Sequence, residues 1–297
     1  MFPDNETAEV WFAERRWGDT PACPHCGSLN VQSGCQHKTM PYRCREKGCA
    51  RRFSVKIGTV MEGSNLDYQT WAIAMYLMVT NLKSISSMKL HRELNITQKT
   101  AWHLAHRLRK ALETTGNPFL GPVEVDEVYL GGVRKNMSNV KRKVLADAGA
   151  GRGAVGKTAV AGIKDRASNQ VRAQVVNFVD SKTLREFIDW NATPEATVYT
   201  DDAAAYSNLS HQHETVKHSV SEYVKGQAHT NGVESFWAML KRGYHGTFHH
   251  FSKKHTDRYV AEFAGRHNLR EHDTLDIFKV FARNMEGKRL CYRELVA

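Results

Sequence analysis

Apolar residues follow a helical spacing in the first part of the chain and a strand spacing beyond residue 118. From Leu66 onward, apolar side chains recur three and four positions apart, which indicates helices with one buried face. After 118, short valine-rich runs bounded by glycine or polar residues indicate strands. The pattern therefore predicts a helical segment at 63–117 and a mixed α/β layer at 118–270.

Two helices of the first segment are separated by a short break at Asn95-Ile-Thr97. The predicted helices, 86–94 and 98–112, have the spacing of a helix-turn-helix. An apolar stripe on the second helix would leave its polar and basic residues on other faces, where they suit a DNA major groove. Those residues are Lys99, Thr100, His103, Arg107 and Lys110. An ordinary helical hairpin with a solvated basic face fits the spacing equally well, so both interpretations stay open.

The α/β layer is predicted to have the element order of a ribonuclease H-like domain. Its predicted elements are strands at 123–130, 158–163, 170–178 and 197–200, with a helix at 181–190. In that order the first and fourth strands are neighbours, which would bring Asp126 close to Asp201 at one edge of the sheet. A last helix is predicted at 275–283.

Composition and charge indicate the partner. The 297 residues carry a formal net charge of +11, and the sequence pI is about 9.4. This excess of Lys and Arg favours a polyanion through counterion release, so double-stranded DNA is the natural partner. No apolar run reaches the roughly 18 residues of a membrane span, and no basic amphipathic anchor is present, so no membrane partner is expected. The chain opens without a signal peptide, which predicts a reducing, cytoplasmic location at a prokaryotic nucleoid.

Four cysteines form two closely spaced pairs near the N-terminus. Cys23 and Cys26 make one pair, and Cys44 and Cys49 make the other, across a glycine-containing spacer. This spacing is typical of a zinc ribbon, in which four thiolates hold a structural Zn²⁺ ion. A small hairpin module has too little apolar area to fold alone, so the metal would stabilise it. The alternatives are a redox pair or unrelated thiols, and the other two cysteines are predicted to be free.

Three acidic residues lie on or beside predicted elements. Asp126 lies on a predicted strand, Asp201 follows the fourth strand, and Glu234 opens a predicted helix. Each has an ordinary explanation: a solvated strand face, a helix cap, and a capping box that Glu234 would form with Asn231. However, Glu234 and Lys241 are seven positions apart and share one helix face. A carboxylate and a cation on one face suit metal binding beside a phosphate.

The segment from Gly151 to Thr158 matches the phosphate-loop pattern letter by letter. Such a loop needs a strand before it and a helix after it, whereas here a polar or helical connection precedes it and a strand follows. No nucleotide cofactor is therefore expected. The segment is interpreted as part of a basic loop that lies along DNA phosphates. That loop carries Arg134, Lys135, Lys141, Arg142 and Lys143.

Taken together, these motifs resemble the DDE insertion-sequence transposases that carry an N-terminal zinc ribbon before an ISXO-type catalytic domain. The resemblance rests on Cys-Pro-His-Cys-Gly at 23–27, Val-Glu-Val-Asp-Glu-Val-Tyr-Leu-Gly-Gly at 123–132, His-Thr-Asn-Gly-Val-Glu-Ser-Phe-Trp at 229–237 and Phe-His-His-Phe-Ser-Lys-Lys-His at 248–255. It implies a ribonuclease H-like fold in which Asp126 and Asp201 are the first two metal ligands. The third position varies among such proteins, and it is carried to Glu234, with Asn231 as the alternate and Lys241 as the basic partner.

The predicted fold class is therefore a multidomain α/β protein. Residues 1–62 are expected to form the zinc ribbon, 63–117 the helix-turn-helix, and 118–270 the ribonuclease H-like catalytic domain of mixed β-sheet with flanking helices. Residues 271–297 are expected to form a C-terminal helical tail.

The resemblance also implies a mechanism of metal-dependent cleavage followed by strand transfer. Two Mg²⁺ or Mn²⁺ ions, roughly 3.5 to 4 Å apart, would activate water and then a DNA 3′-hydroxyl. Asp126 would bridge both ions, Asp201 and Glu234 would hold one each, and Lys241 would steady a phosphate. Joining two element ends implies a homodimer or larger assembly on DNA. A catalytically silent DNA-binding regulator and a structure-selective nuclease of the same fold remain the alternatives.

Overall fold

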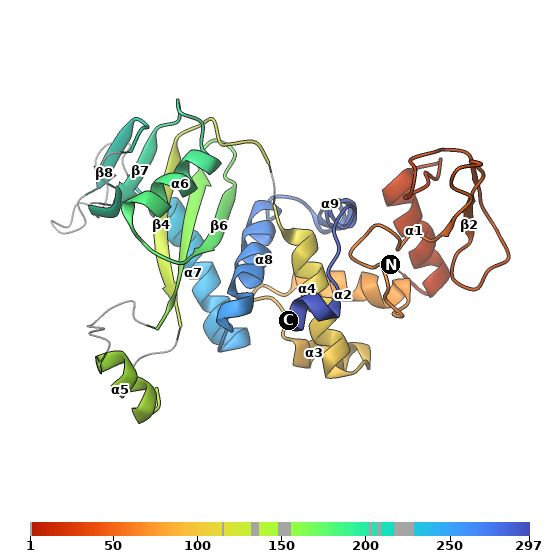
Figure 1. Cartoon of the computed structure of the whole chain (residues 1–297), viewed down its shortest axis with the longest axis horizontal. Coiled ribbons are helices and arrows are strands. Elements are labelled where there is room, and N and C mark those ends of the chain that lie inside the picture. Colours follow the sequence, from red (N-terminus) through yellow and green to blue (C-terminus); the bar gives the residue numbers. More distant parts are fainter. Residues whose placement is uncertain are drawn as a thin grey trace. The chain divides into compact units, whose positions relative to one another are not determined.

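The computed structural model describes residues 2–114, 116–131, 137–147, 156–201, 204–206, 209–216 and 229–297. The chain divides into two compact units (Figure 1). The N-terminal unit comprises Met1–Leu112 together with Glu271–Ala297, and the central unit comprises Glu113–Arg270. None of the described helices is both long enough and apolar enough to cross a membrane.

The N-terminal unit opens with α1 (Asn5–Trp17), which is followed by a small antiparallel sheet. Its three strands are β1 (Val31–Gln32), β2 (Tyr42–Cys44) and β3 (Arg52–Phe53), in that order across the sheet. The core of this module contains only a few buried side chains, including Cys23, Cys44 and Phe53. So small an apolar cluster cannot offset the conformational entropy of an ordered module by itself.

Helices fill the rest of the N-terminal unit. They are α2 (Tyr68–Thr80), α3 (Ser87–Leu94), α4 (Gln98–Leu112), α9 (Thr274–Asn284) and α10 (Tyr292–Val296). Asp67 and Ser86 accept backbone N–H bonds at the starts of α2 and α3, which explains where these helices begin. Asn95 ends α3 in the left-handed region at φ 49°, so α4 starts in a new direction. The predicted limits of α3 and α4 are confirmed, and the predicted tail helix corresponds to α9.

The central unit is built on a five-stranded mixed sheet of order β6-β5-β4-β7-β8. Its strands are β4 (Val123–Leu130), β5 (Thr158–Asp165), β6 (Val171–Val176), β7 (Val198–Asp201) and β8 (His213–Val216). The strands β4, β5 and β6 pair antiparallel, whereas β7 pairs parallel with β4 and with β8. The predicted adjacency of the first and fourth strands is therefore confirmed.

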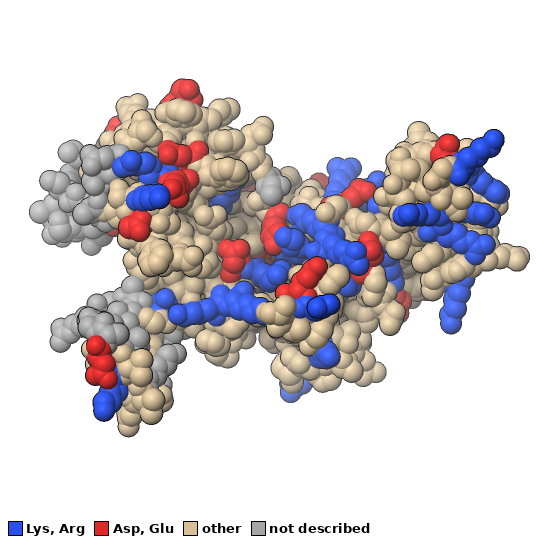
Figure 2. All heavy atoms as spheres, viewed as in Figure 1, with Lys and Arg blue, Asp and Glu red and all other residues tan. Residues whose placement is uncertain are grey.

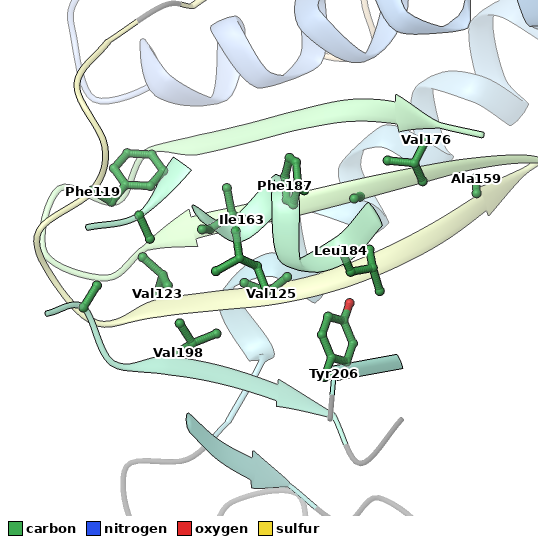
Figure 3. Close-up of a cluster of buried hydrophobic side chains, with 14 residues drawn as sticks. Phe119, Val123, Val125, Ala159, Ile163, Val176, Leu184, Phe187, Val198 and Tyr206 are labelled. Atoms are coloured by element: carbon green, nitrogen blue, oxygen red, sulfur yellow. The ribbon is translucent and has the colours of Figure 1, made fainter. Parts of the chain in front are cut away.

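Helices cover both faces of this sheet. One face packs against α6 (Ser181–Asn191) through a cluster that includes Val125, Ile163 and Phe187 (Figure 3). The other face packs against α7 (Asn231–Gly243) and α8 (Thr256–Asn268) through Val128, Val160 and residues of both helices. Alternate residues of β4 therefore face different helices. Asp126 is on the α7 side, because it lies two positions from Val128.

Some elements differ from the prediction. The structure adds α1 and β8 to the predicted elements, and α5 (Asn139–Asp147) forms in the connection before the phosphate-loop pattern, which was predicted as polar or helical. The tail predicted as a separate region at 271–297 packs within the N-terminal unit.

Candidate metal centres and nucleic-acid contacts

The two predicted aspartates lie side by side on neighbouring parallel strands. The β4–β7 register pairs Glu124 with Tyr199, so Asp126 and Asp201 are level, each two residues further along. Both side chains are partly buried. Glu234 is in the first turn of α7, the helix that covers the same face. The structure thus brings one acidic side chain from each of three elements to one region of the sheet.

The negative charges of these residues act on one another. The pKa of Asp126 is raised to about 7. Burial is the main cause; a hydrogen bond from the Glu127 backbone N–H lowers the pKa, and the charges of Glu127, Asp201 and Glu234 also raise it. Oxygen-rich, mutually repelling carboxylates are the groups that divalent cations such as Mg²⁺ neutralise. Asp126, Asp201 and Glu234 therefore supply the donor type that such cations prefer, although their oxygens are not gathered within 4.8 Å of one another as the ligand atoms of a closed metal cluster are.

A tryptophan of α7 holds Asp126 directly. The Trp237 Nε1–H donates to Asp126 Oδ2 at 3.0 Å. Opposite Asp126 on β5 stands Gly162, where an added Cβ would lie 2.5 Å from Trp237 Cζ2. Glycine at this position therefore lets the indole ring lie against the sheet and reach the carboxylate. Neither Trp237 nor Gly162 was predicted to belong to the site.

Glu127 is a further acidic neighbour that the sequence analysis did not assign to the site. Its Oε2 accepts a hydrogen bond from the hydroxyl of buried Tyr206 at 2.6 Å. Burial is the main cause that raises the pKa of Glu127, and the charge of Asp201 adds to it. Glu127 therefore contributes negative charge to the region of Asp126 and Asp201 while its side chain is held by Tyr206.

The start of α7 differs from the capping box considered in the sequence analysis. The N-cap residue is Thr230, and its side chain makes no capping bond to the backbone. Asn231 is the first helical residue and is exposed, whereas the Thr230 hydroxyl donates to Glu234 Oε1 at 3.1 Å. Lys241 is exposed two turns further along the helix. The capping-box explanation for Asn231 and Glu234 is therefore wrong.

The four paired cysteines come together in the N-terminal unit. The Cys23 and Cys49 sulfurs are 3.8 Å apart, and those of Cys26 and Cys44 are 3.6 Å apart. All four Sγ atoms lie within 4.8 Å of one another. A tetrahedron with Zn–S arms of about 2.3 Å has edges of roughly 3.8 Å, so this cluster has the dimensions of a zinc site. Among the described residues it is the one such cluster of three or more potential ligands.

The predicted DNA-contacting residues of α4 have different surroundings. His103 Nε2 lies 3.1 Å from the Leu290 carbonyl oxygen, and Arg107 donates to that oxygen and to the Glu62 carbonyl, each at 3.0 Å. Arg107 is only 7% exposed. Its guanidinium therefore holds the C-terminal segment onto α4, and we assign Arg107 a structural role.

The remaining residues of that set stay closer to solvent. Lys99 is exposed, with its Nζ 4.5 Å from the centre of the Tyr292 ring. The Thr100 hydroxyl contacts that of Thr97 at 2.8 Å, and Lys110 is partly buried. Lys99, Thr100 and Lys110 therefore remain candidates for DNA contact.

The predicted basic loop is only partly described. Arg134 and Lys135 lie outside the described residues, as does the segment 151–155 of the phosphate-loop pattern, and the side chain of Lys141 is likewise not described. Arg142 and Lys143 are exposed on α5. Immediately after Gly156-Lys157 the chain forms the strand β5, as predicted.

Exposed basic residues also gather over the N-terminal three-stranded sheet (Figure 2). They include Lys38, Arg45, Lys47, Arg51 and Arg52. None of these belonged to the predicted contact set, although the basic composition of the segment could have indicated them. Such a surface is suited to phosphate groups.

The pKa of Asp126 predicts how stability depends on pH. In the folded, metal-free protein this carboxyl holds its proton up to about pH 7, whereas the ordinary value of 3.8 applies to the unfolded chain. Between these values the folded state binds more protons, so the free energy of unfolding should fall as pH rises from 4 to 7. At about 1.4 kcal/mol per pKa unit, this fall in the free energy of unfolding is at most about 4 kcal/mol. Urea unfolding of metal-free wild type and Asp126→Asn across this range should show a flatter profile for the variant; parallel profiles would contradict the assignment.

The contact between Gly162 and Trp237 gives a second expectation. Gly162→Ala should displace the indole ring and destabilise the central unit by about 1–3 kcal/mol, as overpacking of a well-filled core does. The hydrogen bond from Trp237 to Asp126 should lengthen at the same time. Urea unfolding gives the stability change, and the indole N–H chemical shift reports the hydrogen bond. An unchanged unfolding midpoint with an unchanged shift would show that the ring is not held in this way.

Similarity to known proteins identifies the family of this chain. Residues 118–268 match the ISXO2-like transposase domain. The chain is also 28% identical over 249 residues to an uncharacterized protein in transposable element ISH50 of Halobacterium salinarum, an alignment that covers 81% of this chain and 83% of that protein. The resemblance predicted from the motifs is thereby confirmed. The chain belongs to the ISXO2-like transposase family.

Proposed function

We propose that this protein binds the ends of an insertion sequence and catalyses metal-dependent DNA cleavage and strand transfer. The observation that carries the proposal is the convergence of Asp126, Asp201 and Glu234 on one face of the sheet, where their charges interact. The order β6-β5-β4-β7-β8, with its antiparallel and parallel parts, supports a ribonuclease H-like fold. In this proposal the three acids are the metal ligands, and exposed Asn231 is the alternate for the third position.

The residues of the site would have the following roles. When bound, two Mg²⁺ or Mn²⁺ ions would supply the Lewis acidity for in-line displacement at a phosphodiester. Asp126, held by the Trp237 N–H, must release its proton to serve as a ligand, because its pKa in the metal-free protein is about 7. Lys241, on the exposed side of α7, would contact a DNA phosphate.

DNA recognition is assigned to the N-terminal unit. The zinc ribbon, the basic residues over its sheet, and Lys99 and Thr100 at the start of α4 would contact the element ends. The αL turn at Asn95 between α3 and α4 supports a helix-turn-helix. Arg142 and Lys143 on α5 would bind phosphates of the same or the target DNA. A homodimer or larger assembly is the expected active form, because two ends are joined together.

The test is product analysis with DNA from the element itself. Purified protein is incubated with Mg²⁺ or Mn²⁺, a labelled DNA segment from either flank of its own gene, and a plasmid target. Joined products are expected. Cleavage without joining would identify a nuclease of the same fold, and DNA binding without either reaction would identify a regulator.

A further inference from the structure

A second acidic residue of β4, Glu124, is buried beside the proposed site. It lies two positions before Asp126, on the same side of the sheet, and is 2% exposed. A buried carboxylate costs several kcal/mol unless it is paired and hydrogen-bonded. The partners of Glu124 therefore indicate what the residue is for.

Glu124 has three partners in the central unit, which come from the turn after β5, from the residues just before α7 and from α7 itself. Its Oε1 accepts from Arg166 Nε at 2.8 Å and lies 3.2 Å from His229 Nδ1. Its Oε2 accepts from the backbone N–H of Val233 at 3.0 Å. Arg166 also donates from Nη2 to the His229 carbonyl at 2.6 Å, and its guanidinium lies over the Tyr199 ring. We call Glu124, Arg166 and His229 the α7 clamp.

The clamp acts on the N-terminus of α7. Thr230 provides no side-chain cap for the backbone, so the Val233 N–H is satisfied by a carboxylate from a strand 109 residues earlier. A negative charge at this end also interacts favourably with the helix dipole. Gly232 permits the approach, because an added Cβ would lie 2.7 Å from Glu124 Oε2. Glu234 follows Val233 directly.

We propose that Glu124 is a positioning residue, which fixes the first turn of α7 on β4 and thereby sets the place of Glu234 opposite Asp126 and Asp201. This inference rests on the proposed function, since it gives Glu234 the third metal-ligand position. Glu124 and Asp126 belong to the same strand, β4. The clamp therefore fixes the position of Glu234 relative to Asp126 through that strand. Partners that orient metal ligands typically change metal affinity about 10- to 100-fold when altered.

The test compares Glu124→Gln with Glu262→Gln in the full chain. Glu262 is a matched control: it is fully buried on α8, it does not belong to the clamp, and its Oε1 lies 3.7 Å from Arg266 Nη1. Mn²⁺ affinity is measured by calorimetry, and exchange of the Val233 amide is measured by NMR. Glu124→Gln is expected to weaken Mn²⁺ binding about tenfold and to speed Val233 exchange at least tenfold. Glu262→Gln is expected to change neither.

Equal Mn²⁺ affinity in Glu124→Gln and wild type would overturn the proposal, as would equal weakening in both variants. If Glu124→Gln does not fold, Glu124→Asp replaces it, because it keeps the charge beside Arg166 but is too short to hold the Val233 amide as well. Strand transfer by wild type is assayed in parallel. Its absence would count against the proposed function, whereas active wild type with an unaltered Glu124→Gln variant would count against the clamp alone.

Discussion

Asp126→Asn should abolish DNA cleavage and strand transfer while leaving DNA binding unchanged. Asp126 lies in the middle of β4, accepts a hydrogen bond from Trp237, and interacts with the charges of Asp201 and Glu234. Metal stabilisation of a phosphodiester transition state is worth several kcal/mol, and each 1.4 kcal/mol, roughly, is tenfold in rate. The expected loss is therefore about 10³-fold or more, measured as the rate of product formation from a labelled element end.

A control separates loss of chemistry from loss of fold. Glu195→Gln removes an exposed carboxylate that precedes β7, at the opposite end of the strand from Asp201, and should keep full activity. Asp126→Asn should also keep wild-type affinity for the element end in a gel-shift assay, because Asp126 is not one of the residues proposed to contact DNA. Strand transfer near the wild-type rate in Asp126→Asn would remove this residue from the catalytic set.

Removal of zinc should unfold the ribbon and eliminate recognition of the element ends. Cys26→Ser takes away one of four sulfurs that stand at zinc-site distances, in a module whose apolar core is too small to fold alone. Wild type is expected to contain one zinc per chain by elemental analysis, and Cys26→Ser to contain much less. Affinity for the labelled end should fall at least about tenfold, and treatment of wild type with a chelator should have the same effect.

Cys35→Ser is the matched control, because Cys35 lies in the same module and outside the four-sulfur cluster. It should retain zinc, end binding and the resistance of the ribbon to proteolysis. Full zinc content in Cys26→Ser, or loss of zinc in Cys35→Ser, would show that the ligand set is wrong.

Local patterns were sufficient to predict most elements of the fold. The limits of β4, α3 and α4 follow from apolar periodicity and from breaks such as Asn95, which are properties of adjacent residues. The adjacency of β4 and β7 also followed, because strand order restricts the topology. By contrast, β8 has only 4 residues, most of them polar, so its alternation was too weak to be recognised.

The unpredicted parts of the site depend on contacts between distant residues. The bond from Arg107 to Leu290 joins residues 183 positions apart, so helical spacing could not reveal that the basic residue holds the C-terminal segment. Trp237 was not assigned to the site, because its hydrogen bond to Asp126 requires the packing of α7 on β4. Glu124 was not assigned either, because an acidic residue that alternates with valines on a strand is also typical of a solvated face.

If Asp126, Asp201 and Glu234 together hold catalytic divalent ions, those ions can be located directly. Crystals of the protein bound to an element end, grown with Mn²⁺, would show them by anomalous scattering. We expect Mn²⁺ coordinated by oxygens of Asp126 and Asp201, with Glu234 completing the set. Mn²⁺ bound elsewhere, with these three carboxylates uncoordinated, would show that they are not the metal ligands.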